Sequence, residues 1–427
     1  MTNQMWAIWK SKLWNALDRQ RQSHVVLVKP INLNADKDDK VFIEAKHLKV
    51  YRTIWTWIDL MAFVVGLSAF REAKINARMV YTASMICFAF VCLFYTIVVI
   101  WPSIPLLLEV ICIYGVLIPV CMGTLKFILI LRDMKQVVPM YRFFENILIS
   151  HTTGRRSDDL VREMNDAYNK VKIFVVVSVL CFAVFVLYPI HAYITEGQLI
   201  PIMRIEFPFV DQTVIKGYLI GQAFMLLFGV LGLVGSVAFD LAVLTFLLEF
   251  KSLVTLLVHD LDDYEEFSKE NETYSTQYKD SFLKNICRKY NDIHRYLRCF
   301  QRMFADITYH SICALYGSLI CSVYAALNNG WISGYGFCLF CFVQLYVQCI
   351  LGTFVHIQND RMSQAFYLIP WYEYPIRVQK IFLLLIHAST FNAVKLRIGP
   401  YAPLDVQTGL MITKSIFSYY TAISSLT

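Results

Sequence analysis

Long runs of apolar residues constrain this chain more than any other feature. A helix needs about 20 such residues to cross the hydrocarbon core of a bilayer. Inside a bilayer the backbone must satisfy its own hydrogen bonds, so runs of this kind form helices. Six runs meet the condition, at residues 80–101, 104–131, 171–194, 218–248, 307–327 and 335–355. The sequence therefore predicts an all-α, polytopic membrane protein.

Composition supports this class over a soluble one. Only 17% of the residues are charged, whereas a soluble domain carries about 25%. Residues 1–50 are mostly polar, so we expect no cleavable signal peptide before the first apolar run.

The seventh apolar region is interrupted. Residues 378–388 are apolar but too short to span, and a polar stretch, 389–405, follows them. A final helix then begins near Val406, with Asp405 as its predicted N-cap. We therefore expect seven transmembrane helices, the seventh of them split. Residues 57–70 are also too short to span, and we interpret them as a re-entrant or interfacial element.

Basic residues predict the orientation, because cytoplasmic loops carry an excess of Lys and Arg. Residues 1–78, 132–172, 251–302 and 361–380 together hold 33 Lys and Arg, whereas the opposite side receives Arg204 and Lys216. The N-terminus is therefore predicted to be cytoplasmic and the C-terminus extracellular. The net charge of +7 then reflects inner loops that face anionic lipid rather than nucleic acid.

The final helix has two unlike faces. At about 100° per residue, an apolar stripe and an arc of small, mostly hydroxyl-bearing residues separate. The stripe is Ile412, Ile416, Tyr419, Tyr420 and Ile423, and the arc is Ser415, Ser418, Ala422 and Ser425. Two interpretations fit this pattern: a wall of a water-filled pore, or small-residue packing against another helix.

Residues 251–304 are predicted to be helical extensions below the membrane. Apolar residues recur there at three- and four-residue spacing, at Phe282, Ile286, Tyr290, Ile293, Leu297, Phe300 and Phe304. This spacing is typical of an amphipathic helix that continues into the fifth span. A pore built from one final helix per chain requires several chains, so we expect an oligomer.

Signals for enzymatic chemistry are missing from the sequence. We find no nucleotide-binding glycine loop, nucleophile elbow or paired catalytic carboxylates. Cys338 and Cys341 have metal-ligand spacing but lie in an apolar run, where cysteine behaves as a small apolar side chain. We expect no enzyme activity, metal or cofactor. Glu109 and Asp240 are ionisable groups inside predicted spans, where such groups are often functional, although Asp240 is near enough to the inner end to face cytoplasmic water.

The C-terminal block resembles the insect odorant receptors. The resemblance is carried by residues 363–367 (SQAFY), Trp371 and residues 412–421 (ITKSIFSYYT). Phe417 stands where that family typically has tyrosine, and Tyr420 where it has phenylalanine. The resemblance implies a ligand-gated, non-selective cation channel in the plasma membrane of olfactory sensory neurons. It also implies a tetramer with a pore lined by the last helix and an anchor of cytoplasmic helices.

The loop between spans four and five indicates which kind of member this is. The family's shared coreceptor, Orco, has a long insertion there, whereas about twenty residues separate the two helical extensions in this chain. The resemblance thus implies a ligand-tuning subunit that assembles with Orco in a heterotetramer. A gustatory-type channel of the same architecture remains the main alternative, with a G-protein-coupled receptor or a transporter after it.

These interpretations divide the chain into segments and select candidate residues. The segments are 1–78 (cytoplasmic, including the element 57–70), 79–250 (spans one to four), 251–304 (cytoplasmic helical anchor), 305–360 (spans five and six), 361–404 (cytoplasmic part of helix seven) and 405–427 (pore-lining helix). A small volatile odorant is expected in the outer half of the bundle, at Tyr114, Leu117, Phe185, Tyr188, His191, Phe224, Met225 and Tyr316. The predicted pore and gate residues are Ser415, Ser418, Ala422, Ile423 and Leu426.

Overall fold

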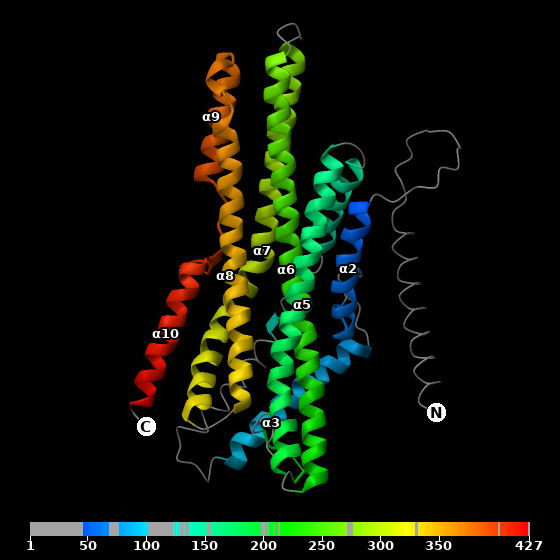
Figure 1. The fold of residues 1–427 in the computed structure, drawn as a ribbon, viewed down its shortest axis with the longest axis vertical. Coiled ribbons are helices and arrows are strands. Elements are labelled where there is room, and N and C mark those ends of the chain that lie inside the picture. Colours follow the sequence, from blue (N-terminus) through cyan, green and yellow to red (C-terminus); the bar gives the residue numbers. More distant parts are fainter. Residues whose placement is uncertain are drawn as a thin grey trace, which may run out of the picture. The chain divides into compact units, whose positions relative to one another are not determined.

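The computed structural model describes a bundle of long helices (Figure 1). It describes residues 46–67, 77–100, 123, 125–126, 128, 132, 136–151, 155–197, 202, 205–208, 210–211, 214–270, 276–328, 332–399 and 402–425. The elements are α2 (Lys46–Val64), α3 (Ala77–Ile100), α5 (Arg155–Glu196), α6 (Ile215–Glu270), α7 (Thr276–Asn328), α8 (Ile332–Leu368), the short 3-10 helix η2 (Trp371–Glu373), α9 (Ile376–Phe391), the strands β1 (Arg397–Ile398) and β2 (Ala402–Pro403), and α10 (Val406–Ser424). Residues 136–150 are also helical.

The apolar runs become membrane-length helices. Within the described ranges, five helices are long and apolar enough to cross a bilayer, namely α3, α5, α6, α7 and α8. The predicted second span, 104–131, lies almost entirely outside the described residues. The helical architecture of the prediction is confirmed.

Several helices extend well beyond the predicted spans. α6 has 56 residues and α7 has 53, and the first half of α7 contains the amphipathic helix predicted from the spacing. α5 begins at Arg155, so most of the segment 132–172, expected to be a cytoplasmic loop from its basic residues, is helical. Residues 155–170 are rich in charged side chains, which makes their helical pattern hard to recognise in the sequence.

α2 differs in its limits from the predicted element at 57–70. It begins at Lys46 and ends at Val64, and Gly66 follows in a left-handed conformation with φ of 89°. Such a glycine commonly closes a helix, because it lacks the Cβ that would make this conformation unfavourable. The inner face of α2 packs on α5 and α6. Whether any part of it enters a membrane stays a prediction.

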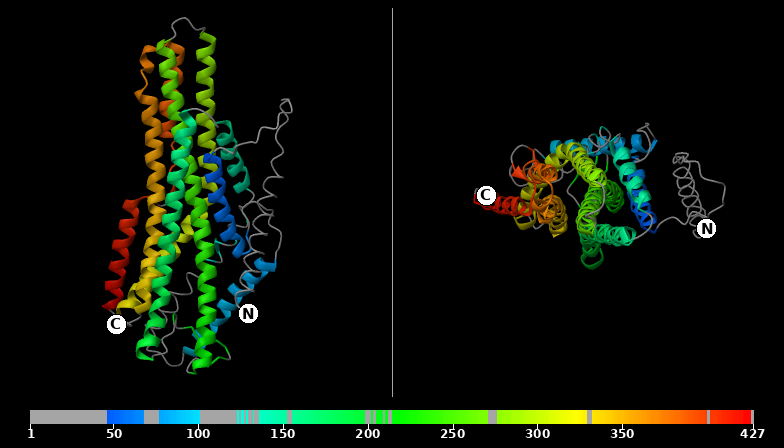
Figure 2. Two further views of the ribbon diagram at one scale, coloured as in Figure 1. Left: turned by 45° about the vertical axis from the view of Figure 1, so that its right-hand side comes forward. Right: turned by 90° about the horizontal axis from the view of Figure 1, so that it is seen from above.

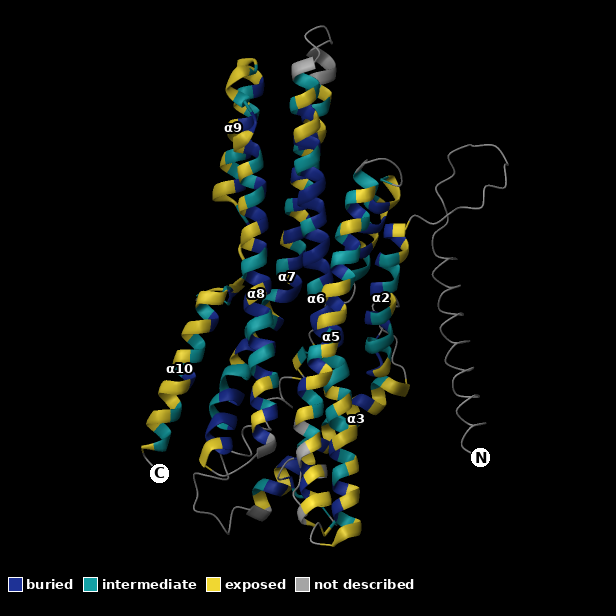
Figure 3. Ribbon diagram, in the orientation of Figure 1, coloured by how far each residue is buried: buried dark blue, intermediate teal, exposed yellow. Residues whose placement is uncertain are grey.

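Among the described residues, the largest core cluster joins α2, residues 136–150, α9 and parts of α5, α6, α7 and α8. Figure 3 shows this buried stretch along α6 and α7. At its centre the Glu249 carboxylate accepts hydrogen bonds from the Tyr51 hydroxyl (3.1 Å), the Trp55 indole (3.1 Å) and the Tyr296 hydroxyl (2.7 Å). A buried carboxyl group needs such donors to offset its desolvation, so the network stabilises one arrangement of α2, α6 and α7.

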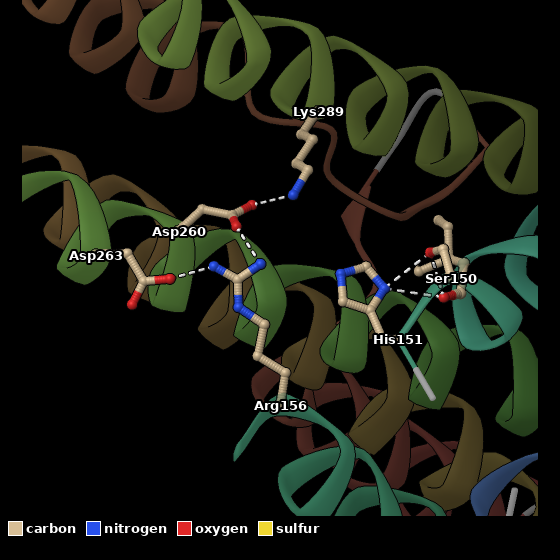
Figure 4. A network of polar contacts seen from close by, with 7 residues as sticks. Ser150, His151, Arg156, Asp260, Asp263 and Lys289 are labelled. Carbon is tan, nitrogen blue, oxygen red and sulfur yellow. Dashed lines mark hydrogen bonds and ion pairs between the residues drawn. The ribbon is translucent and has the colours of Figure 1, made fainter. Parts of the chain in front are cut away.

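Ion pairs connect the ends of α5, α6 and α7 (Figure 4). Arg156 bridges Asp260, at 2.9 Å, and Asp263. Lys289 binds the other oxygen of Asp260 at 2.5 Å. Asp260 is buried, so its two cationic partners form a network rather than an isolated surface pair. Nearby, the His151 ring and the Ser150 hydroxyl are 2.9 Å apart.

The predicted break in the seventh apolar region is confirmed. α9 and α10 are separate helices joined through a hairpin of β1 and β2. The Asp405 side chain accepts a hydrogen bond from the Thr408 amide at 2.6 Å, as its N-cap assignment requires. The hairpin crosses α8 at Gly352, where an added Cβ would lie 1.9 Å from the Leu404 carbonyl oxygen. This close approach fixes the start of α10 against α8.

Candidate functional site

An apolar cavity of about 290 Å³ lies among the helices. Its walls come from α3, α5, α6, α7 and α8, together with residues near the end of α2. Leucine, isoleucine, phenylalanine and methionine make up about half of the lining residues, and most of the others are small or apolar. Cavities of this kind, with few polar groups, are typical binding sites for small organic molecules.

Two of the predicted ligand-contacting residues line this cavity, Phe224 and Met225 of α6. The Phe224 ring is held edge-on between Phe88 and Phe207, with ring centroids 4.9 and 5.2 Å away. Such edge-to-face contacts orient an aromatic ring. The Phe224 side chain is therefore a positioned part of the wall.

The other predicted ligand residues are distributed differently. Tyr114 and Leu117 lie outside the described residues, as do the side chains of Phe185 and Tyr188. His191 is exposed on α5. Tyr316 is absent from the cavity lining, and its hydroxyl instead contacts Ser415 of α10 at 2.6 Å.

Glycines of α6, which are not among the predicted site residues, create part of the space. Gly229, Gly232 and Gly235 recur at three-residue spacing and line the cavity. A Cβ at Gly232 would meet nothing within 4 Å. The signal was present in the fourth apolar run, because glycines so spaced share one face of a helix.

The cavity also extends further inward than predicted. Its polar lining includes Lys126, Ser236, Ser311 and Gln344. Ser236 and Ser311 lie in the inner halves of their predicted spans, as does Lys126. Asp240 stands behind Ser236 and is only 4% exposed, so it does not face open water in the described chain. The cavity thus has a polar end, on the side that the sequence predicts to be inner, and an apolar end.

α10 packs against α7 and α8 (Figures 1 and 2). Ile416 is fully buried there, with Ile412 and Tyr420 beside it. Gly409 permits close contact, because an added Cβ would lie 3.0 Å from the Cys349 sulfur. Two hydroxyl contacts cross the interface, from Tyr316 to Ser415 at 2.6 Å and from Tyr346 to Thr413 at 3.1 Å.

The two predicted faces of α10 separate in this interface. Most of the apolar stripe packs inward, although Tyr419 is 53% exposed. Ser418, Ala422 and Ser425 lie on the exposed side, together with Lys414. Ser415 is half-buried beneath Tyr316 and Ile423 is half-buried, whereas Leu426 lies outside the described residues. An exposed row of small and hydroxyl side chains is compatible with contact with water.

α7 and α8 therefore stand between the cavity and α10. On α7, Ser311, Leu315 and Ser318 line the cavity, while Tyr316 contacts α10. On α8, Gln344 lines the cavity and Tyr346 contacts α10.

These features define a multi-pass helical membrane protein with an internal apolar cavity beside a short terminal helix. Residues 106–417 match the family model described as 7tm Odorant receptor, and the chain belongs to this family. It is a family of receptors rather than of enzymes.

The fold is also that of solved insect receptors. The chain is similar to the insect olfactory receptor OR5 from Machilis hrabei in complex with eugenol, with a TM-score of 0.67 and 12% identity over 88% of this chain and 100% of that one. A second structure of the same receptor gives a TM-score of 0.66 with the same identity and coverage. At this identity the likeness shows the fold alone.

Proposed function

We propose that this chain is an odorant receptor subunit of a ligand-gated, non-selective cation channel. Small volatile organic molecules bind in the cavity and open a pore lined by α10. The observation that carries the proposal is the placement of an apolar cavity one helix layer away from α10. The complex of the Machilis hrabei receptor with eugenol supports a small organic ligand here as well.

The size of the cavity suits an odorant. An engineered apolar cavity of about 150 Å³ holds benzene. A cavity of about 290 Å³ therefore has room for a molecule of roughly ten non-hydrogen atoms. Burial of such a molecule in an apolar cavity is favourable because its surface leaves water.

Gating follows from differential binding. A ligand shifts a conformational equilibrium only as far as it binds one state better than the other. The Tyr316–Ser415 and Tyr346–Thr413 contacts couple the cavity-lining helices to α10. We expect the ligand to favour an arrangement of α7 and α8 that moves α10 and widens the pore beside Ser418 and Ala422.

The channel requires several subunits, because each chain contributes one α10. We propose a heterotetramer with Orco coreceptor subunits in the plasma membrane of olfactory sensory neurons. The N-terminus is cytoplasmic and the C-terminus extracellular, as the distribution of basic residues predicts.

Co-expression of the full chain with Orco, followed by current recording across a panel of volatiles, tests the function. We expect odorant-dependent cation currents that Orco alone does not give. Currents that require a G protein, or no response to any volatile despite delivery of the chain to the cell surface, would refute the proposal.

Gly232→Leu tests whether the cavity is the ligand site. The leucine side chain would project into open cavity space, and leucine favours a helix more than glycine does. Potency for the largest active odorants should fall at least tenfold, while surface expression stays normal. Leu219→Ala, at a position on the same helix that is 57% exposed, serves as a control and should leave potency unchanged.

A further inference from the structure

The inner end of the cavity contains a group of polar side chains that an apolar ligand does not need. Lys126, Ser236 and Gln344 line the cavity there, and Asp240 lies directly behind. Lys126 and Ser236 approach to 3.5 Å, as do Ser236 and Asp240. Polar groups at membrane depth are costly and are usually retained for a function.

Gln344 is the decisive residue of this group. It is 3% exposed, and its side-chain nitrogen makes no hydrogen bond of normal geometry. Its interaction with the Asp240 carboxylate is only a looser one. A buried amide left in this state carries a desolvation cost that an acceptor in the cavity would offset.

The Gln344 nitrogen is a donor without an acceptor of normal hydrogen-bond geometry at this end. Lys126 carries three N–H groups, and the Gln344 amide carries two. The Asp240 carboxylate and the Ser236 hydroxyl are the nearby acceptors, while the Ser311 hydroxyl already accepts a hydrogen bond from Gln348 at 2.9 Å. A ligand that brings one more acceptor complements this arrangement, whereas a pure hydrocarbon does not.

We infer that Gln344 and Lys126 form a hydrogen-bonding anchor that selects ligands with a carbonyl or ether oxygen at one end of an apolar body. The ligand oxygen accepts from the Gln344 amide and lies within the field of the Lys126 ammonium. Its hydrocarbon part extends outward along α6 toward Phe224. This inference rests on the proposed function, since it assigns a ligand class to the same cavity.

The test measures ligand binding to the purified full-length chain by thermal stabilisation, because a ligand that binds only the folded state raises its stability. Two pairs of probes match a ketone with the hydrocarbon in which CH₂ replaces oxygen. They are 2-nonanone with 2-methyl-1-nonene, and acetophenone with α-methylstyrene. Each variant is compared with the unaltered chain for the same probe, so that partition into detergent cancels.

Gln344→Met removes the amide and keeps the length of the side chain. We expect the half-saturating concentration of at least one ketone to rise about three- to tenfold, the value of one hydrogen bond, while that of its hydrocarbon partner changes less than twofold. Gln344→Asn keeps an amide and should preserve the ketone preference at reduced affinity. Gln358→Met removes another buried glutamine of α8 that is not among the cavity-lining residues and should affect neither probe.

Equal losses for ketone and hydrocarbon, or no loss for either, would overturn the anchor. Failure of both ketones to bind the unaltered chain would overturn it too. Current recordings with Orco distinguish failure of the anchor from failure of the proposed function. Binding with the expected selectivity but without current refutes the channel, whereas odorant-evoked current that ignores Gln344 refutes only the anchor.

Discussion

Two stretches of α6 contrast within one continuous helix. Around Gly229 and Gly232 the helix borders open space, whereas Phe246, Phe250 and Val254 are fully buried among α2, α5 and α7. The first stretch can adapt to contents of different shape, because small residues leave room. The second is close-packed and transmits displacement with little loss. One helix thus combines an adaptable cavity wall with a rigid, close-packed support.

Glu249→Leu is expected to lower the stability of the protein more than any other change considered, because it removes the shared acceptor at the centre of the packed region. Tyr51, Trp55 and Tyr296 lose their strongest partner, at a cost on the order of 3 kcal/mol of folding free energy. Surface expression and the thermal midpoint in detergent should both fall sharply. Glu249→Gln retains an acceptor oxygen and should lose much less. Equal behaviour of the two variants would show that the network does not support the fold.

Gly352→Ala should uncouple α10 while leaving the packed region intact. The new methyl group would collide with the Leu404 carbonyl oxygen, so the hairpin before α10 must move. We expect most of the odorant-evoked current to disappear at near-normal surface expression. Ile350→Ala, at an exposed position two residues away, is the matched control. Normal currents in Gly352→Ala would mean that the contact at Leu404 does not set the position of α10.

Cysteines on the exposed row of α10 test the pore assignment directly. Ser418→Cys and Ala422→Cys should react with aqueous thiol reagents during stimulation and lose about half of the current or more, because an added group obstructs a narrow pore. Ile416→Cys, at a fully buried position, should be unaffected by the reagent. The pore assignment fails if the two exposed cysteines behave like the buried one.

Tyr316→Phe should weaken the coupling between the cavity and α10. Loss of the 2.6 Å contact with Ser415 costs about 1 kcal/mol, so the half-maximal odorant concentration should change about three- to tenfold. The change should be the same for all odorants, since Tyr316 does not line the cavity. Ser415→Ala combined with Tyr316→Phe should add nothing to either single change. Additive effects would refute the coupling.

Much of the fold could be predicted, because the length of each apolar run predicts a membrane helix. The polar stretch 389–405 likewise predicts the break between α9 and α10. The Asp405 cap and the amphipathic spacing from Phe282 to Phe304 were equally local signals. The start of α5 at Arg155 was not predicted, because charged side chains hid its helical pattern.

The site was harder to predict than the fold, because lining a cavity depends on which way neighbouring helices turn. Phe224 and Met225 line the cavity, but Tyr316 sits on the α10 side of its helix. Which helix a side chain of α7 contacts depends on packing between segments that are far apart in the sequence. The unsatisfied Gln344 nitrogen likewise becomes visible only when α6 and α8 are placed together.

Substitutions in ion pairs have the smallest expected effects on stability. They compare a network around a buried carboxyl group with a pair that is exposed to solvent. Arg156 binds the buried Asp260, whereas Arg132 and Asp306 form a pair at 3.2 Å with side chains that are 51% and 58% exposed. Exposed pairs contribute about 0–1 kcal/mol and are screened by salt. Arg132→Gln should therefore shift the thermal midpoint little, and Arg156→Gln should shift it more, because Asp260 would lose one of two cationic partners. If 1 M salt abolishes the Arg156 effect as fully as the Arg132 effect, the Asp260 network is no more protected from solvent than a surface pair.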